Sequence, residues 1–199
     1  MKQIDWLFFD VGSTLVNEEK AYQDRIKQAL ADTNISYAAF YQTMIHYFME
    51  NKKGDVEALK YYGLKCPSWK SDLETLYPGC KHVLKTLHSH YKIGILANQL
   101  PNLLARLRNF GIDSYIDLII SSADVGLAKA NLAIFKLALQ QANCLAKHAV
   151  MIGDRLDNDI LPAKQLGMRT IWIRQGFSRL THITNPAETP DWTVDNWQK

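Results

Sequence analysis

Long apolar runs, abundant cysteine and a strong net charge are all missing from this 199-residue sequence. No stretch approaches the roughly 20 apolar residues that a membrane-spanning helix requires, and Lys2 and Asp5 around the first apolar run do not fit a signal peptide. The few cysteines lie far apart, in no metal-binding spacing, which is typical of a reduced protein: Cys66, Cys80 and Cys144. The sequence therefore predicts a cytoplasmic location and no membrane partner.

Basic side chains do not gather into a patch. The net charge is +3, and the longest basic clusters are pairs such as Lys52 and Lys53. Because nucleic-acid binding needs a larger basic surface, we expect no nucleic-acid partner. Internal repeats and low-complexity segments are also missing, and the length suits one globular unit that carries a smaller insertion, as a monomer or a weak homodimer.

Short apolar runs that are continuous rather than alternating predict strands buried on both faces. These runs occupy residues 4–9, 91–97, 117–121, 149–153 and 169–173, with a weaker edge strand at 191–194. Helical apolar spacing lies between them, and Gly111 and Gly167 mark two helix ends. Alternating strands and helices predict an α/β fold with a Rossmann-like, doubly wound, mainly parallel sheet.

Residues 17–76 interrupt this alternation. Their apolar residues recur at helical spacing in three groups, separated by turn signals at 32–34 and 51–54. We therefore expect a small all-helical domain at 17–76, inserted after the first strand. Residues 1–16 and 77–199 are expected to form the α/β core domain.

Polar side chains follow four of the predicted strands. Asp10 ends the first strand, Asn98 follows the second, Lys129 lies between the third and a helix, and Asp154 and Asp159 follow the fourth. The carboxyl ends of parallel strands form the ligand-binding edge of such sheets, so we expect these groups to meet there. Converging carboxylates repel one another unless a cation neutralises them, which favours Mg²⁺ in a phosphoryl-transfer site. Asp10 is then a candidate nucleophile toward phosphorus, and Lys129 a group that stabilises charge.

Four segments in this order resemble the motifs of the haloacid dehalogenase (HAD) superfamily: FFDVGSTL, IGILANQ, GLAKANLAIF and VMIGDRLDNDILPAKQLGMRTIWI. The predicted helical insertion falls where that family carries its C1-type cap. The resemblance implies an Mg²⁺-dependent phosphohydrolase that acts on a small phosphorylated metabolite.

The resemblance also implies a role for each matching residue. Asp10 would become an aspartyl-phosphate, and Lys129 would bridge this nucleophile and the phosphoryl oxygens. The Mg²⁺ ligands would be Asp10, the backbone carbonyl of Gly12 and Asp154, with support from Asp159. Thr14 would shape the first loop, and Thr14, Asn98 and Lys129 are the expected substrate-binding residues.

Two positions depart from the family pattern. Gly12 stands where phosphatases of the family carry a second aspartate as general acid and base, and Ala97 stands where they carry Ser or Thr. General acid–base help is worth about 10²–10⁴-fold, so we expect an enzyme that is slow or selective for good leaving groups. Gly12→Asp should raise activity toward alkyl phosphates by about one to two orders of magnitude. Substitute proton donors that the sequence does not place are Glu18, Glu19 and His46.

Other readings stay open at this point. One is a catalytically impaired HAD-fold protein that binds metal and an anion, or a protein partner, without turnover. Another is a dehalogenase or a phosphonate-cleaving member of the family. Asp157 is expected to cap a helix rather than to bind metal.

Overall fold

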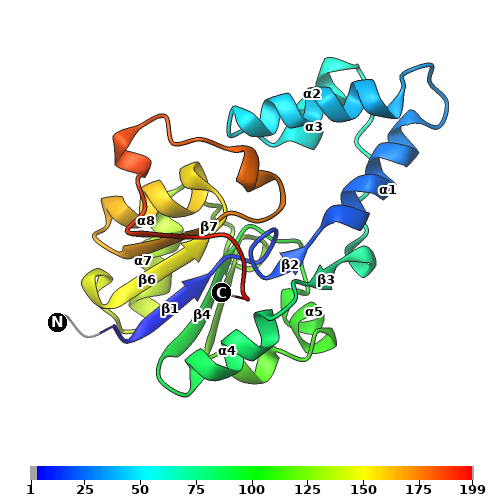
Figure 1. Ribbon diagram of the computed structural model, residues 1–199. Coiled ribbons are helices and arrows are strands. Elements are labelled where there is room, and N and C mark those ends of the chain that lie inside the picture. Colours follow the sequence, from blue (N-terminus) through cyan, green and yellow to red (C-terminus); the bar gives the residue numbers. More distant parts are fainter. Residues whose placement is uncertain (1–3, 199) are drawn as a thin grey trace.

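The computed structural model describes residues 4–198 and is built on one six-stranded parallel sheet, in the order β5–β4–β1–β6–β7–β8 (Figure 1). The strands are β1 (Trp6–Phe9), β4 (Lys92–Ala97), β5 (Leu118–Ser121), β6 (Ala149–Gly153), β7 (Arg169–Ile173) and β8 (Trp192–Val194). Each begins and ends within two residues of its predicted bounds. The weak pattern near the C-terminus does form the edge strand β8.

Helices cover both faces of this sheet. They are α4 (Cys80–His88), α5 (Leu103–Asn109), α6 (Ser122–Val125), α7 (Leu132–Gln141) and α8 (Leu161–Gln165). On one face, Leu84 of α4 and Leu107 of α5 pack in one buried cluster with Ile95 of β4. On the other face, Phe135 of α7 packs in a second cluster with Phe8 of β1. The predicted doubly wound α/β fold is confirmed.

Shorter helical turns fill the connections. The 3₁₀ segments are η1 (Ser71–Leu73), η2 (Asp113–Tyr115), η3 (Ala146–His148), η5 (Gly176–Leu180) and η6 (Pro186–Glu188). One turn of π-helix, η4 (Leu156–Ile160), joins β6 to α8.

Three helices are inserted between two very short strands that follow β1. The strands β2 (Val16–Asn17) and β3 (Thr75–Leu76) pair antiparallel and enclose α1 (Glu19–Leu30), α2 (Tyr37–Met49) and α3 (Gly54–Tyr61). The three helices share a small apolar core of their own that includes Phe40, Met44 and Leu59. Figure 1 shows them projecting beyond the sheet on the side where β1 leads into β2. The helices match the prediction for this segment, whereas two-residue strands carry no periodic pattern and were not predicted; the domain boundaries 1–16, 17–76 and 77–199 stay a prediction.

The end of α2 contacts the sheet domain. Phe48 stacks on Phe177 with ring centroids 4.3 Å apart and planes 4° apart. Thr181 donates a hydrogen bond to the backbone oxygen of Phe48 at 3.3 Å, and Arg155 donates one to that of Asn51 at 2.8 Å. The segments that follow β6 and β7 therefore hold the insertion over the carboxyl edge of the sheet.

Within residues 4–198, no helix combines the length and the apolar character needed to cross a bilayer. The three cysteines are free thiols.

Candidate active site

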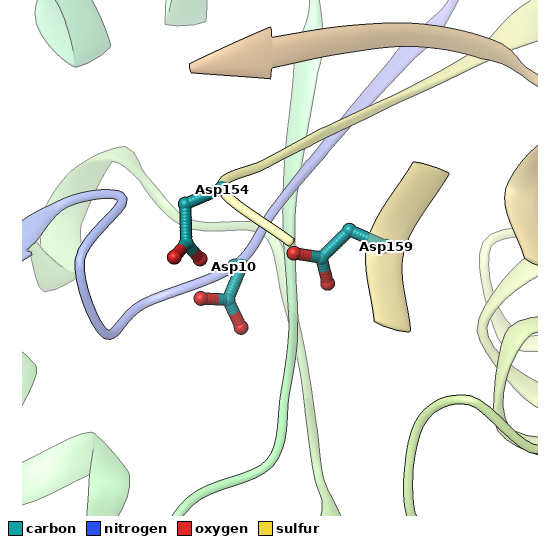
Figure 2. A group of neighbouring side chains, drawn as sticks. All are labelled: Asp10, Asp154 and Asp159. Atoms are coloured by element: carbon teal, nitrogen blue, oxygen red, sulfur yellow. The ribbon is translucent and has the colours of Figure 1, made fainter. Parts of the chain in front are cut away.

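Three aspartate side chains converge at the carboxyl edge of the sheet (Figure 2). Asp10 directly follows β1, Asp154 directly follows β6, and Asp159 lies in the π-helical turn after β6. Each offers a carboxylate oxygen within 4.8 Å of the other two, and all three residues are buried. The sequence prediction that these side chains meet is confirmed by this geometry.

The local chain conformation explains how Asp159 reaches the group. The backbone N–H groups of Asp159 and Ile160 both donate to the oxygen of Arg155, a wide turn that directs Asp159 back toward β6. The N–H of Arg155 in turn donates to Oδ2 of Asp159 at 3.0 Å. A Cβ on Gly153 would overlap the Asp159 carboxylate, so only glycine fits at the end of β6. π-turns of this kind are frequent at functional sites.

Lys129 is the cation that faces two of these carboxylates. Its Nζ lies 2.6 Å from Oδ1 of Asp10 and 2.5 Å from Oδ1 of Asp159, with the lysine side chain 2% exposed. Burial opposes the charged form of Lys129, but the two carboxylates outweigh burial and raise its pKa above the ordinary value. Lys129 is therefore a fixed positive charge beside the candidate nucleophile.

Asn98 positions Lys129 from the end of β4. Its Nδ2 donates to the backbone oxygen of Lys129 at 2.8 Å, and its Oδ1 accepts from the backbone N–H of Lys129 at 2.8 Å. Both ends of the amide are thus engaged with the neighbouring loop. A direct contact of Asn98 with substrate stays a prediction.

Thr14 lies beneath the site rather than on its surface. It is fully buried, and its hydroxyl donates to Oδ1 of Asp154 at 3.4 Å. Its backbone oxygen accepts from Gln175 and from Trp197, which ties the loop after β1 to the C-terminal segments. These contacts give Thr14 a positioning role, and its expected contact with substrate stays a prediction.

Glu18 lies in the same cavity, next to Gly12. A Cβ placed on Gly12 would lie 2.6 Å from Oε1 of Glu18 and 2.9 Å from its Oε2. The Ser13 hydroxyl donates to Oε2 at 3.0 Å. Burial raises the pKa of Glu18 to about 8; the hydrogen bond from Ser13 opposes this shift, and the carboxylate of Glu74 adds to it.

Of the three proton donors considered from the sequence, only Glu18 is placed at the site. Glu19 is exposed and accepts a hydrogen bond from Gln23. The His46 side chain is 69% exposed and faces Glu50. Sequence spacing could not separate Glu18 from its neighbour, because the choice depends on how the chain turns after β2.

Asp157 does not cap a helix as expected. Its carboxylate accepts hydrogen bonds from Nε and Nη2 of Arg155 at 2.9 and 2.6 Å, and no side chain caps the turn that contains it. The expected helix cap was wrong because Arg155, two residues earlier, offers a bidentate charged partner; the expectation that Asp157 does not bind metal stays a prediction. Arg155 itself, which bridges to the inserted helices, was missed by the sequence analysis.

A cavity of about 480 Å³ opens between these side chains and the inserted helices. The aspartates, Lys129 and Glu18 line its floor, and aromatic rings from the insertion and the loop after β7 also line it: Tyr22, Phe48, Trp69 and Phe177. Most other aromatic residues of α2 and α3 pack among themselves, as the sequence suggested. The space is sufficient for a small organic molecule with a charged group at the floor.

The donor set fits a hard divalent cation. Lys129 pairs with Asp10 and Asp159, but among residues 4–198 no cationic side chain forms an ion pair with Asp154. Burial, together with the carboxylates of Asp10 and Asp159, raises the pKa of Asp154 well above its ordinary value. Buried oxygen donors with excess negative charge are the ligands that Mg²⁺ prefers. Participation of the Gly12 carbonyl stays a prediction.

Comparison with known proteins places these features in a family. A family model for haloacid dehalogenase-like hydrolases matches residues 4–167. Pyrimidine 5'-nucleotidase YjjG of Escherichia coli is 28% identical, over 96% of this chain and 94% of that protein. A glyceraldehyde 3-phosphate phosphatase of Methanocaldococcus jannaschii is 37% identical, over 59% of this chain and 53% of that protein. Among solved structures, an HAD phosphatase from Thermococcus onnurineus is similar with a TM-score of 0.67 and 21% identity, covering 98% of this chain and 94% of the other.

Proposed function

Because the chain belongs to the family of haloacid dehalogenase-like hydrolases, we propose that it is a Mg²⁺-dependent phosphohydrolase that acts through an aspartyl-phosphate on Asp10. Membership makes it a hydrolase, and phosphatases among its relatives support phosphate esters as substrates. The observation that carries the proposal is the buried group in which Lys129 contacts Asp10 and in which Asp154 and Asp159 complete an oxygen-rich cluster.

The chain's own residues account for the first step. Lys129 holds Oδ1 of Asp10, so Oδ2 is the oxygen available to attack phosphorus. The ammonium group beside it favours the approach of a phosphate dianion and the charge that develops on the phosphoryl oxygens. A bound Mg²⁺ would be held by Asp10, Asp154 and Asp159, and would neutralise carboxylate and phosphate charge so that the two can meet. Ala97 offers no hydroxyl to the phosphate, which supports a slower reaction than a site with Ser or Thr at this position would give.

The substrate class follows from the cavity and from the relatives. The relatives named above act on a pyrimidine nucleotide and on glyceraldehyde 3-phosphate, both small phosphomonoesters. The cavity of about 480 Å³ accommodates molecules of this size, and its aromatic walls favour an apolar or ring-bearing portion. We place the protein in the cytoplasm, as a monomer or weak homodimer, with a phosphorylated small molecule as its partner.

A substrate screen tests this function. The purified chain is incubated with Mg²⁺ and uridine 5'-monophosphate, glyceraldehyde 3-phosphate, phosphoserine or p-nitrophenyl phosphate, and released phosphate is measured. We expect turnover that EDTA abolishes and that Asp10→Asn abolishes without unfolding the protein, together with a phosphoryl or beryllofluoride adduct on Asp10. Asp113→Asn, an acid remote from the cavity that faces Arg108, is the matched control and should keep full activity.

The competing function, metal and anion binding without turnover, is favoured by the missing side chain at Gly12. It predicts a Mg²⁺-dependent rise in melting temperature while none of the four phosphate compounds is hydrolysed. Such a result with correctly folded protein would replace the phosphohydrolase proposal.

A further inference from the structure

The space where a side chain at position 12 would begin is filled by another carboxylate. All three atoms of the Glu18 carboxyl group lie within 2.9 Å of the position that a Cβ on Gly12 would occupy. Gly12 is two residues beyond the candidate nucleophile Asp10, and both line the cavity together with Glu18. Any larger residue at position 12 would have to displace Glu18.

The Glu18 carboxyl group is also oriented. Ser13, the residue next to Gly12, donates its hydroxyl to Oε2 at 3.0 Å. Within residues 4–198, Oε1 accepts no hydrogen bond, and it is the atom of the Glu18 carboxyl group nearest to the Cβ position of Gly12. Glu18 lines the cavity. Oε2 is therefore fixed by Ser13, and among the described residues no donor engages Oε1.

From this geometry we infer that Glu18 is the general acid and base of the reaction, in place of a residue at position 12. The inference rests on the proposed phosphohydrolase function. Glu18 lies between β2 and α1. The group that transfers the proton is therefore part of the insertion and not of the loop after β1.

The proton balance of both steps is then complete. In the first step Oδ2 of Asp10 forms a bond to phosphorus, the bond from phosphorus to the leaving oxygen breaks, and Oε1 of Glu18 gives its proton to that oxygen. In the second step a water oxygen attacks the phosphorus of the aspartyl-phosphate, and the bond between phosphorus and Oδ2 of Asp10 breaks. The Glu18 carboxylate takes the proton from the water. Ester and water give alcohol and phosphate, and Glu18 ends as it began.

The test compares leaving groups in Glu18→Gln, which keeps the size and the Ser13 contact of the side chain. The probes are p-nitrophenyl phosphate, whose leaving group needs no proton, and whichever alkyl phosphate of the screen is turned over fastest by the wild-type chain. We expect turnover of the alkyl phosphate to fall by about 10²–10⁴-fold. With p-nitrophenyl phosphate we expect a rapid burst of one equivalent of nitrophenol, followed by slow turnover as the phosphoenzyme accumulates.

Two controls separate this role from folding or metal binding. Glu19→Gln, one residue along the chain and exposed, should keep the wild-type rates. The rise in melting temperature on adding Mg²⁺ should be unchanged in Glu18→Gln, because a metal ligand at this position would lose it. The double variant Gly12→Asp, Glu18→Ala moves the carboxylate to position 12. It should turn over the alkyl phosphate at least about tenfold faster than Glu18→Ala alone.

The outcomes are distinct. If the wild-type chain hydrolyses no probe, the proposed function fails and this inference fails with it. If the wild-type chain is active but Glu18→Gln keeps its turnover of the alkyl phosphate, the inference is overturned and the proposed function stands. The same holds if Glu18→Gln loses turnover of both probes equally and shows no burst.

The same geometry revises the expectation for Gly12→Asp alone. The new side chain displaces Glu18, so the net gain in activity toward alkyl phosphates should stay below one order of magnitude.

Discussion

At position 129 a single ammonium group faces two of three buried carboxylates. The Lys129 side chain is 2% exposed and contacts both Asp10 and Asp159, whereas Asp154 has no cationic partner in the part of the chain that the structure describes. Removing one member of a buried ion pair leaves uncompensated charge, which is far more destabilising than removing an exposed pair.

We therefore expect Lys129→Met to destabilise the protein by about 3–5 kcal/mol and to abolish measurable hydrolysis. Urea denaturation in EDTA measures the first effect, and phosphate release measures the second. Lys60→Met, which removes an exposed lysine that pairs with Glu57 on α3, should change stability by no more than about 0.5 kcal/mol. Retained activity in Lys129→Met would remove the lysine from the mechanism.

Asp154 should show the opposite behaviour. Its burial and its neighbours Asp10 and Asp159 disfavour its charge, so Asp154→Asn relieves repulsion when no metal is bound. We expect the free energy of unfolding of Asp154→Asn in EDTA to equal or exceed that of the wild-type chain. In the wild-type chain, Mg²⁺ at 100 times its dissociation constant should raise the free energy of unfolding by about 2.7 kcal/mol. Asp154→Asn should not show this increase.

Thermal unfolding with and without Mg²⁺ measures both quantities. Asp157→Asn is the matched control, since Asp157 pairs with Arg155 and should keep the full response to Mg²⁺. A full response in Asp154→Asn would place the cation elsewhere.

At this scale the sequence could predict the residues that end strands but not those placed by loops. Asp10 and Asp154 directly follow buried apolar runs, so topology alone brings them to one edge. Lys129 lies in the loop between α6 and α7, and its hydrogen bonds with Asn98 bring it to the same edge. Glu18 depends on the conformation of the turn after β2, and nothing in its own sequence context distinguishes it from Glu19.

Among the elements, two strands are each preceded by an aspartate that accepts hydrogen bonds from the neighbouring strand. Asp117 precedes β5 and accepts a hydrogen bond from the N–H of Ile93 in β4, at 2.9 Å. Asp191 precedes β8 and accepts from the N–H and the hydroxyl of Thr170 in β7, at 2.9 and 3.0 Å. Each aspartate thus fixes the register of its strand on the neighbour.

The hydrogen-bonded carboxylate of Asp191 predicts a pH-dependent contribution to stability. Burial opposes the charge on Asp191, but its hydrogen bonds to Arg169 and Thr170 outweigh burial and hold its pKa below the ordinary 3.8. A lowered pKa stabilises the folded state fully above 3.8, and the stabilisation disappears as the pH falls through the folded-state pKa. Asp191→Asn should therefore lower the free energy of unfolding by about 1–2 kcal/mol at pH 7.

The difference between wild type and Asp191→Asn should shrink as the pH falls below 3.8, which urea denaturation across that range measures. Asp195→Asn, whose side chain is 77% exposed, should give a difference near zero at every pH. A difference for Asp191→Asn that does not change with pH would mean that the charge contributes nothing.

The strands β1, β4, β5, β6 and β7 of the main sheet were the most predictable elements, because each lies in a continuous apolar run. The turn at η4 was the least predictable. Helical spacing beginning at Ile160 indicates an ordinary helix, whereas the chain first makes one wider turn that carries Asp159 to the site. That turn is specified by contacts of the folded state, such as the close approach of Asp159 to Gly153, which periodicity does not record.

For the molecule as a whole, activity depends on keeping the inserted helices over the sheet edge. If Glu18 handles the proton, the insertion carries a reacting group as well as the cavity wall, so its placement affects chemistry and binding together. Phe48 and Tyr41 of α2 both contact Phe177 in the segment after β7, Phe48 in a stack and Tyr41 in a tilted contact with centroids 6.2 Å apart. Tyr22 of α1 packs edge-on against the same ring with centroids 5.2 Å apart.

Phe177→Ala should loosen this junction without disturbing the sheet, because Phe177 belongs to neither of the two clusters that cover the sheet faces. The three aromatic contacts of Phe177, with Phe48, Tyr22 and Tyr41, at about 0.5–1.5 kcal/mol each predict a loss of about 1.5–4.5 kcal/mol in the free energy that holds the insertion against the sheet domain. We expect kcat/KM for an alkyl phosphate to fall about tenfold or more, and proteolysis between β2 and β3 to accelerate. Tyr61→Ala removes an exposed ring on α3 that contacts Tyr62 of the insertion edge-on, and it should leave both measurements unchanged. Equal effects of the two substitutions would show that the insertion is held by its helices' own packing rather than by the contact at Phe177.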